Sequence, residues 1–229
     1  MTFICIIPAR SGSKRIKNKN TVKVKNKKLI QYTIDAALKV KKIKKVIITT
    51  NIKNLSKKRN KKLVIINRPN DLCKDNSTTE SAILHVIKSK PKIFKKKINI
   101  VLLQPTSPMR DSKDIQSAIK SFESKKLDSL FSAYQDRIFF WKYKKLKFKS
   151  INYSYKNRML SGYMKKKKKE NISYIENGAI YIFKSKGFIK FNNRLFGKIG
   201  CSLMSKINSL EIDFKEDLKT FKAYKGEKF

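Results

Sequence analysis

A short loop near the amino terminus carries residue types suited to binding a phosphate chain. It follows an apolar run at residues 3–7 and contains Ser11-Gly12-Ser13, with Arg10 before this segment and Lys14-Arg15 after it. Small residues let the backbone curl so that successive amides face one anion, and the flanking cations attract that anion. The spacing matches neither the Walker A motif nor GxGxxG, so a solvated basic turn is the structural alternative to a polyphosphate site.

The elements around this loop are those of an α/β protein. Residues 3–7 predict a strand buried on both faces, and Pro8, which lacks an amide donor, is expected to end it. Residues 29–40 have apolar side chains at a helical spacing. Further strands are predicted at residues 46–48, 63–66, 98–103, 127–134 and 174–183. Alternating strands and helices favour a parallel sheet, in which ligands bind beyond the carboxyl ends of the strands, where the basic loop lies.

A second polar loop, Gln104-Pro105-Thr106-Ser107-Pro108-Met109-Arg110, follows the strand at residues 98–103. Its two prolines restrict the backbone, so its amide and hydroxyl groups lose little entropy on binding a ligand. As a structural alternative it is a rigid turn before a helix at residues 111–122, which Asp111 caps.

The segment after residues 63–66 contains a helix start. Ser77 and Glu80 have the spacing of a capping box for a helix at residues 79–87, whatever the function. His85, the only histidine, lies within this helix and is interpreted as a structural residue.

These segments resemble the signatures of the acylneuraminate cytidylyltransferases, or CMP-sialic acid synthetases, a family that includes enzymes acting on pseudaminic and legionaminic acids. The resemblance rests on Ile7-Pro8-Ala9-Arg10 with Gly12-Ser13-Lys14 and Lys19-Asn20, on Arg68-Pro69 with Leu72, Asp75 and Ser77-Thr78-Thr79, on Gln104 to Arg110, and on Asn177-Gly178-Ala179 with Tyr181. It implies a Rossmann-like α/β fold of the nucleotide-diphospho-sugar transferase (GT-A) type, a three-layer sandwich with one domain at residues 1–229. Residues 137–170 would form a small β-rich arm for dimerisation and acceptor binding. Arg15 and Lys17 depart from the family pattern, which commonly has a small residue and a proline there.

The activity implied by the resemblance is a nucleotidyl transfer, in which the anomeric hydroxyl of a nonulosonic, sialic acid-like sugar attacks the α-phosphate of CTP and pyrophosphate leaves. Arg10 and Lys14 are the implied catalytic residues, because they would stabilise the leaving group. The implied nucleotide-binding residues are Arg10, Ser13, Lys14, Lys19, Asn20, Arg68 and Thr79. The implied acceptor-binding residues are Gln104, Thr106, Ser107, Lys142, Arg158 and Asn177. The related synthetase for the eight-carbon acid Kdo is an alternative, and the Lys19-Asn20 ending of the first signature speaks against it.

Glu211 and Asp213 form a close acidic pair in a chain with 16 acidic and 57 basic residues. Two anionic substrates favour a Mg²⁺ cofactor, which needs only one or two protein carboxylates when phosphates and water supply its other ligands. Residues two apart at a predicted strand end share a face. The family often has Asp-x-Asp here, which implies Asp213 as the principal ligand and Glu211 as a direct or water-mediated one. In the structural alternative, Asp213 only caps a final helix at residues 215–224.

The composition excludes several other classes of protein. Cys5, Cys73 and Cys201 lack a zinc-binding or disulfide spacing, and one histidine argues against a zinc site or a Ser-His-Asp triad. No apolar run approaches the ~20 residues of a transmembrane helix. The first strand begins at once, without a secretory signal. We therefore expect a cytoplasmic protein with no membrane partner.

The formal net charge of +41 raises the alternative of a nucleic-acid-binding protein. The basic residues are mostly Lys, spread along the chain without a zinc-finger or RRM-type signature, so no specific nucleic-acid partner is expected. Alternating aromatic residues at 139–148 suggest exposed antiparallel strands. Their apolar surface favours a two-fold homodimer that covers them.

Overall fold

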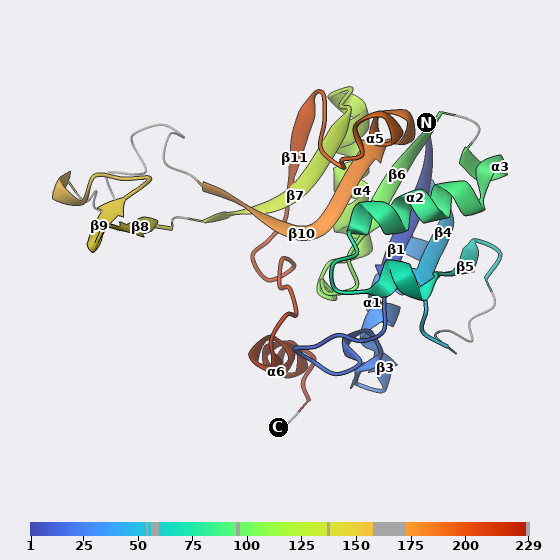
Figure 1. The fold of residues 1–229 in the computed structure, drawn as a ribbon, viewed down its shortest axis with the longest axis horizontal. Coiled ribbons are helices and arrows are strands. Elements are labelled where there is room, and N and C mark those ends of the chain that lie inside the picture. The colour runs from blue at the N-terminus through green and yellow to red at the C-terminus, as the bar shows by residue number, and fades with distance from the viewer. Residues whose placement is uncertain (54, 56–59, 95–96, 137, 158–172, 228–229) are drawn as a thin grey trace.

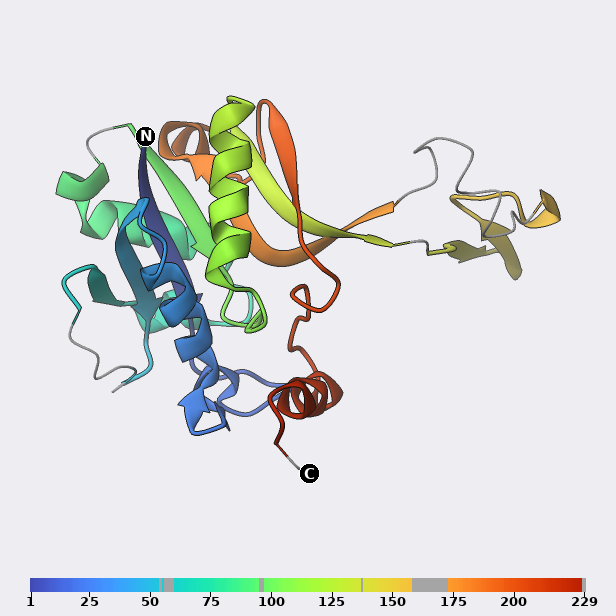
Figure 2. The ribbon, with the colours of Figure 1, turned by 180° about the vertical axis from the view of Figure 1, so that it is seen from behind.

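The computed structural model describes residues 1–53, 55, 60–94, 97–136, 138–157 and 173–227. Within these residues seven strands form a central sheet, and helices cover both of its faces (Figures 1 and 2). The elements are β1 (Thr2–Ala9), β2 (Lys23–Val24), β3 (Lys27–Lys28), α1 (Leu29–Leu38), β4 (Ile43–Thr50), β5 (Leu63–Asn67), α2 (Thr79–Ser89), α3 (Pro91–Phe94), β6 (Ile98–Leu103), α4 (Ser112–Ser124), β7 (Ser129–Asp136), β8 (Trp141–Lys144), β9 (Lys147–Ser150), β10 (Ser173–Lys184), α5 (Ser185–Phe191), β11 (Ile199–Leu203) and α6 (Lys215–Tyr224). In this part of the chain no helix is both long and apolar enough to span a bilayer.

The central sheet has the strand order β11-β7-β10-β6-β1-β4-β5. β1 pairs in parallel with β4 and β6, and β4 with β5, so the carboxyl ends of these strands meet at one edge. The expectation of a parallel sheet is wrong for β10, which runs antiparallel to β6 and β7. The chain leaves β7 into the β8–β9 arm and returns alongside β7, a connection that makes the two strands antiparallel. The α/β fold class expected from the sequence is confirmed.

β1 continues past Pro8, contrary to the expectation that this residue ends it. Pro8 pairs with Thr49 of β4 in the parallel register. The pairing of β1 with β6 stops earlier, at Ile6 and Leu102, so one side of Pro8 has no strand partner. A proline is tolerated where its missing amide removes no ladder bond.

Two apolar layers hold the helices on the sheet. On one face, Cys5 of β1 belongs to a buried cluster with Ile34 of α1 and other side chains of α1 and α4 (Figure 2). On the other face, Ile4 belongs to a cluster with Ile83 of α2 and Phe188 of α5 (Figure 1). Successive side chains of a strand point to opposite faces, so the unbroken apolar run of β1 contributes to both layers.

The start of α2 differs from the expected capping box. Thr78 is the N-cap, and its hydroxyl accepts an amide of the first turn at 3.1 Å. Glu80 instead pairs with Arg194, whose Nε lies 2.8 Å from its carboxylate. The predicted box of Ser77 and Glu80 is therefore wrong, because a cation is the stronger partner for a carboxylate. Asp111 caps α4 as predicted.

α6 lies beside the small β2–β3 hairpin, below the sheet in Figure 1, and packs there through Phe221. The structural alternative, in which Asp213 caps this helix, is wrong. The carboxylate of Asp217 accepts the amides of Asp213 and Phe214, at 2.9 and 2.7 Å. Asp213 does not cap because its own carboxylate faces Lys19 across the chain.

β8 and β9 form a separate hairpin that projects away from the central sheet (Figures 1 and 2). The antiparallel strands predicted within residues 139–148 are thereby confirmed. Tyr143 and Phe148 face each other across the hairpin with ring centroids 4.8 Å apart. They remain 56% and 70% exposed, so the arm presents apolar surface that a single chain leaves uncovered. Residues 137 and 158–170, also expected in the arm, lie outside the described part of the chain.

Candidate active site

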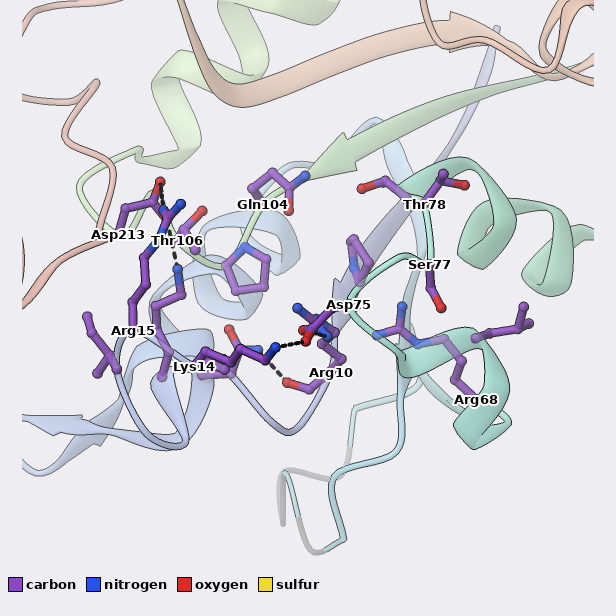
Figure 3. Close-up of a pocket in the computed structure, with 18 residues that line it drawn as sticks. Arg10, Lys14, Arg15, Arg68, Asp75, Ser77, Thr78, Gln104, Thr106 and Asp213 are labelled. Atoms are coloured by element: carbon purple, nitrogen blue, oxygen red, sulfur yellow. Dashed lines mark hydrogen bonds and ion pairs between the residues drawn. The ribbon is translucent and has the colours of Figure 1, made fainter.

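A polar cleft of about 450 Å³ opens beyond the carboxyl ends of β1, β5 and β6 (Figure 3). The loops that follow these strands form most of its wall, and the segment before α6 completes it. The predicted site residues that line it are Arg10, Ser13, Lys14, Lys19, Asn20, Arg68, Thr79, Gln104, Thr106 and Asp213. Its volume is in the range of small-molecule sites.

Hydrogen bonds with two asparagine side chains fix the loop after β1 at the cleft. Asn51, after β4, accepts the amide of Ser11 at 2.8 Å. Asn20 donates from its side chain to the carbonyl of Arg10 at 2.9 Å, which ties the end of the loop to its beginning. Gly12 has a φ of +77°, a left-handed conformation that strains other residues. The predicted contact of Asn20 with a pyrimidine stays a prediction.

Asp75 bridges the two cations expected to be catalytic. Its carboxylate oxygens lie 2.9 Å from Nη1 of Arg10 and 2.6 Å from Nζ of Lys14 (Figure 3). Hydrogen bonds from Lys14 and Arg10 lower the pKa of Asp75, so it is ionised at neutral pH. A carboxylate therefore neutralises these cations at the place where the sequence predicts a phosphate chain.

Arg68 lies at one end of the cleft, and two of its N–H groups form no hydrogen bond with the described residues. The residue is buried, yet its Nε and Nη2 have no hydrogen-bond partner among the described residues. Burial lowers its pKa, and the charge of Arg10 lowers it further. A buried donor without a partner costs about 1–3 kcal/mol, and Arg68 lines the cleft, so an acceptor group that reached its guanidinium would remove part of this cost. Thr78 and Thr79 line the same end.

Thr106 lies at the opposite end, near Arg15 and Asp213 (Figure 3). The carbonyl of Thr106 accepts the amide of Ile212 at 2.8 Å, and its hydroxyl donates to Glu211 at 3.3 Å. These bonds fasten the segment before α6 to the loop after β6. They bring Asp213 to the cleft from the far end of the sequence.

Glu211 and Asp213 lie in the connection between β11 and α6 and not at the end of a strand, which corrects the expectation that an extended backbone aligns them. Asp213 lines the cleft and lies 2.9 Å from Nζ of Lys19 and 3.4 Å from Nη1 of Arg15. Glu211 does not line it, and burial, with the charge of Asp213 adding to it, raises its pKa. The described residues contain no group of three or more His, Cys, Asp and Glu side chains that could hold a metal. Of the pair, only Asp213 lines the cleft, and one carboxylate is enough to hold a Mg²⁺ ion that takes most of its ligands from substrate and water.

Some predicted acceptor residues are not brought to the cleft. Ser107 is fully buried. Asn177 is also buried and donates to the Ser209 hydroxyl at 2.7 Å. Lys142 lies on β8, in the projecting arm (Figure 1). Arg158 is outside the described residues. Ser107, Asn177 and Lys142 therefore do not line this cleft, and their contact with an acceptor stays a prediction.

The cleft residues that received no binding role from the sequence include the polar residues Arg15, Asp75 and Thr78. Arg15 is visible in the sequence only as a departure from the family pattern. Asp75 belongs to one of the signatures. It could have been singled out from the sequence because acidic residues are rare in so basic a chain. Its pairing with Arg10 joins positions 65 apart, which only the tertiary structure could reveal.

Comparison with known sequences shows the family to which this chain belongs. Residues 4–227 match the sequence model described as cytidylyltransferase. The chain belongs to the cytidylyltransferase family. This confirms the family expected from the signatures, and the match covers every loop of the cleft.

Several curated cytidylyltransferases and related proteins are similar to this chain. The N-acylneuraminate cytidylyltransferase of Escherichia coli is 31% identical over 234 residues, which cover 95% of this chain and 50% of that protein. The post-translational flagellin modification protein B of Campylobacter coli is 28% identical over 228 residues, which cover 95% and 92%. The CMP-N,N'-diacetyllegionaminic acid synthase of Legionella pneumophila is 30% identical over 122 residues, which cover 52% and 53%. This cytidylyltransferase thus spans about half the length of the E. coli relative.

Solved structures of two synthetases share the fold of this cytidylyltransferase. A CMP:2-keto-3-deoxy-manno-octonic acid synthetase, solved with CTP, superposes with a TM-score of 0.66 at 14% identity, covering 99% of each chain. The 4-diphosphocytidyl-2C-methyl-D-erythritol synthase of Anaerococcus prevotii superposes with a TM-score of 0.67 at 13% identity, covering 99% of each chain. At these identities the likeness concerns the fold alone.

Proposed function

We propose that this protein transfers the CMP group of CTP to the anomeric hydroxyl of a nonulosonic acid and releases pyrophosphate. The observation that carries the proposal is the order of groups along the cleft (Figure 3). Unpaired donors of Arg68 lie at one end, the cations Arg10 and Lys14 at the centre, and Thr106 with Asp213 at the other end. This order matches a base, a phosphate chain and a sugar acceptor. Relatives named for sialic, legionaminic and pseudaminic acids support the substrate class.

The charges of the cleft serve the reaction by stabilising its leaving group. The acceptor oxygen forms a bond to the α-phosphorus while the bond to pyrophosphate breaks in line, and the hydroxyl proton passes to solvent water. Arg10 and Lys14 exchange Asp75 for phosphate oxygens and stabilise the charge that develops on pyrophosphate. Arg68 donates to the acceptors of the pyrimidine, which fixes the nucleotide along the cleft. Gln104 and Thr106 orient the sugar so that the attack is aligned.

We propose Mg²⁺ as the cofactor, with Asp213 as its ligand and Glu211 in a direct or water-mediated role. The residues fit this ion, because Asp213 reaches the cleft and hard oxygen donors are what Mg²⁺ prefers. When bound, Mg²⁺ would neutralise negative charge on the phosphate groups. Lys19 and Arg15 hold the Asp213 carboxylate at the cleft.

We also propose a cytoplasmic homodimer. The support for the dimer is the exposed apolar surface of the arm, which a second chain would cover, and Lys142 then serves a site that two chains share. The support for the cytoplasm is that Cys5, Cys73 and Cys201 are all free, as in a reducing compartment.

The decisive experiment incubates purified protein with CTP, Mg²⁺ and a panel of acids, with pyrophosphate release as the signal. The panel contains sialic, legionaminic and pseudaminic acids, with Kdo as the eight-carbon control. We expect a nine-carbon acid to give a CMP-sugar, identified by mass spectrometry. Turnover of Kdo alone would replace this proposal with the Kdo activity. Sub-micromolar, sequence-selective nucleic-acid binding at physiological salt, without turnover of any acid, would favour the basic-binder alternative.

A further inference from the structure

Arg110 is a buried cation that joins three parts of the protein. Its side chain is 1% exposed, at the end of the loop after β6. Nη1 donates to the carbonyl of Gln104 at 3.2 Å and to the carbonyl of Ala179 at 2.9 Å. Nη2 donates to the hydroxyl of Thr33 in α1 at 2.7 Å. One guanidinium therefore connects β6, the reversed strand β10 and α1.

Among the described residues no carboxylate forms an ion pair with this cation. Burial lowers the pKa of Arg110 to about 10, although the charge of Asp114 acts to raise it, so the group is protonated at neutral pH. Burial also raises the pKa of the neighbouring Cys5 thiol to about 12, so Cys5 is neutral. The carboxylate of Asp114 hydrogen-bonds to the Asp111 amide and to Asn208. Burying an unpaired charge is unfavourable, and a packed apolar side chain would serve stability as well.

The two carbonyls held by Arg110 belong to the segments that shape the acceptor end of the cleft. Gln104 lines the cleft itself, two residues before Thr106. Ala179 follows Gly178, where an added Cβ would lie 3.6 Å from the carboxylate of Glu211, which Thr106 contacts. A planar guanidinium holds two carbonyls at a set separation, which a flexible ammonium does not do.

We propose that Arg110 is a positioning residue for the acceptor sugar, acting through the Gln104 carbonyl and the β10 segment at Ala179. This inference rests on the proposed function. Arg110 cannot touch the substrate, because its side chain is enclosed by protein. It keeps Gln104 and Thr106 in the arrangement that orients the attacking hydroxyl, while the nucleotide end of the cleft is set by other residues.

Two matched pairs of variants test the inference. Arg110→Lys keeps the charge but loses the planar fork, and Arg110→Gln loses both. Thr33→Val keeps the side-chain volume but loses the hydroxyl, whereas Thr33→Ser keeps the hydroxyl. We expect the KM for the acceptor to rise about tenfold in Arg110→Lys and about threefold in Thr33→Val, from the loss of one or two buried hydrogen bonds. The Kd for CTP should stay within about twofold of wild type, and Thr33→Ser should have the wild-type acceptor KM.

The possible outcomes distinguish a role of Arg110 in positioning the acceptor from a role in stability alone. Active-site concentration is determined by CTP titration, so that unfolded protein does not lower the apparent kcat; the KM does not depend on enzyme concentration. A lower melting temperature with an unchanged acceptor KM in both Arg110→Lys and Thr33→Val would overturn the inference, as would an equal loss of CTP and acceptor affinity. If Arg110→Lys does not fold, the Thr33 pair decides. Wild-type protein that forms no CMP-sugar would overturn the proposed function and this inference with it, whereas active wild type with unchanged variants overturns only the inference.

Discussion

Replacing Arg68 with Met should weaken nucleotide binding while leaving the free protein as stable as before or more so. The reason is that Arg68 lines the cleft and that its buried Nε and Nη2 have no hydrogen-bond partner among the described residues. A nucleotide that accepts from this guanidinium would gain charge-assisted hydrogen bonds worth about 1.5–3 kcal/mol each. Taking about 3 kcal/mol in total, Arg68→Met should raise the Kd for CTP about 100-fold.

The opposite effect is expected on the protein without nucleotide. Met has a similar length but no donors, so the variant avoids the penalty of about 1 kcal/mol or more for buried groups without partners. For a chain of this size, 1 kcal/mol corresponds to about 2–4 °C in melting temperature. Differential scanning fluorimetry measures this change, and isothermal titration calorimetry measures the Kd for CTP. The Kd for pyrophosphate should change less than the Kd for CTP, because Arg10 and Lys14 are the cations proposed to hold the phosphates.

Arg194→Met is the matched control. Arg194 is also largely buried, but it has its partner, since its Nε lies 2.8 Å from Glu80. Removing it leaves Glu80 without its cation, so the melting temperature should fall while the Kd for CTP stays the same. The reasoning is refuted if Arg68→Met lowers the melting temperature as Arg194→Met does and leaves the Kd for CTP within about twofold.

Further predictions concern the centre of the cleft, the metal and the arm. Lys14→Ala should lower kcat/KM about 100-fold in pyrophosphate release, since it removes charge stabilisation of the leaving group; near-normal kinetics would return the loop to a basic turn. Asp75→Asn should tighten CTP binding about threefold by calorimetry, because phosphate no longer competes with a carboxylate for Arg10 and Lys14; weaker binding would mean that Asp75 orders these cations. Asp213→Asn should abolish most Mg²⁺-dependent turnover with little change in melting temperature, as Asp213 is not a cap; wild-type Mg²⁺ dependence would contradict the metal assignment. Light scattering should give twice the chain mass of 26.7 kDa, and Phe148→Ser should lower it toward one chain; a monomeric wild type would contradict the dimer.

The local elements of the cleft could be predicted because their information is local. A run such as residues 3–7, apolar at every position, predicts a strand buried on both faces, and β1 is one. Gly12 between two serines predicts a curled loop, and its φ is left-handed. The ends of parallel strands meet at one edge by geometry alone, so the loops after β1, β5 and β6 were expected to share a site.

Side-chain partners were less predictable, because several groups of the right chemistry compete for each one. Glu80 had the spacing for a capping box but pairs with Arg194, which lies 114 positions away. Asp213 had the position of a cap but faces Lys19 and Arg15. Asn177 belongs to a signature, yet its side chain bonds within the protein. Spacing along the chain shows that a contact is possible, and the folded neighbours decide which contact is made.

The sequence by itself determined the α/β class, the family and most of the residues around the cleft, since strands, tight turns and signatures depend on short stretches of chain. The tertiary structure alone decided the reversed direction of β10, the bridge of Asp75 between two cations and the link that Arg110 makes between the Gln104 and Ala179 carbonyls. These features join residues up to 85 positions apart, as in the pairing of Lys184 with Asn99, and their energies depend on burial and on the charges nearby. Burial and neighbouring charge exist only after the chain has folded.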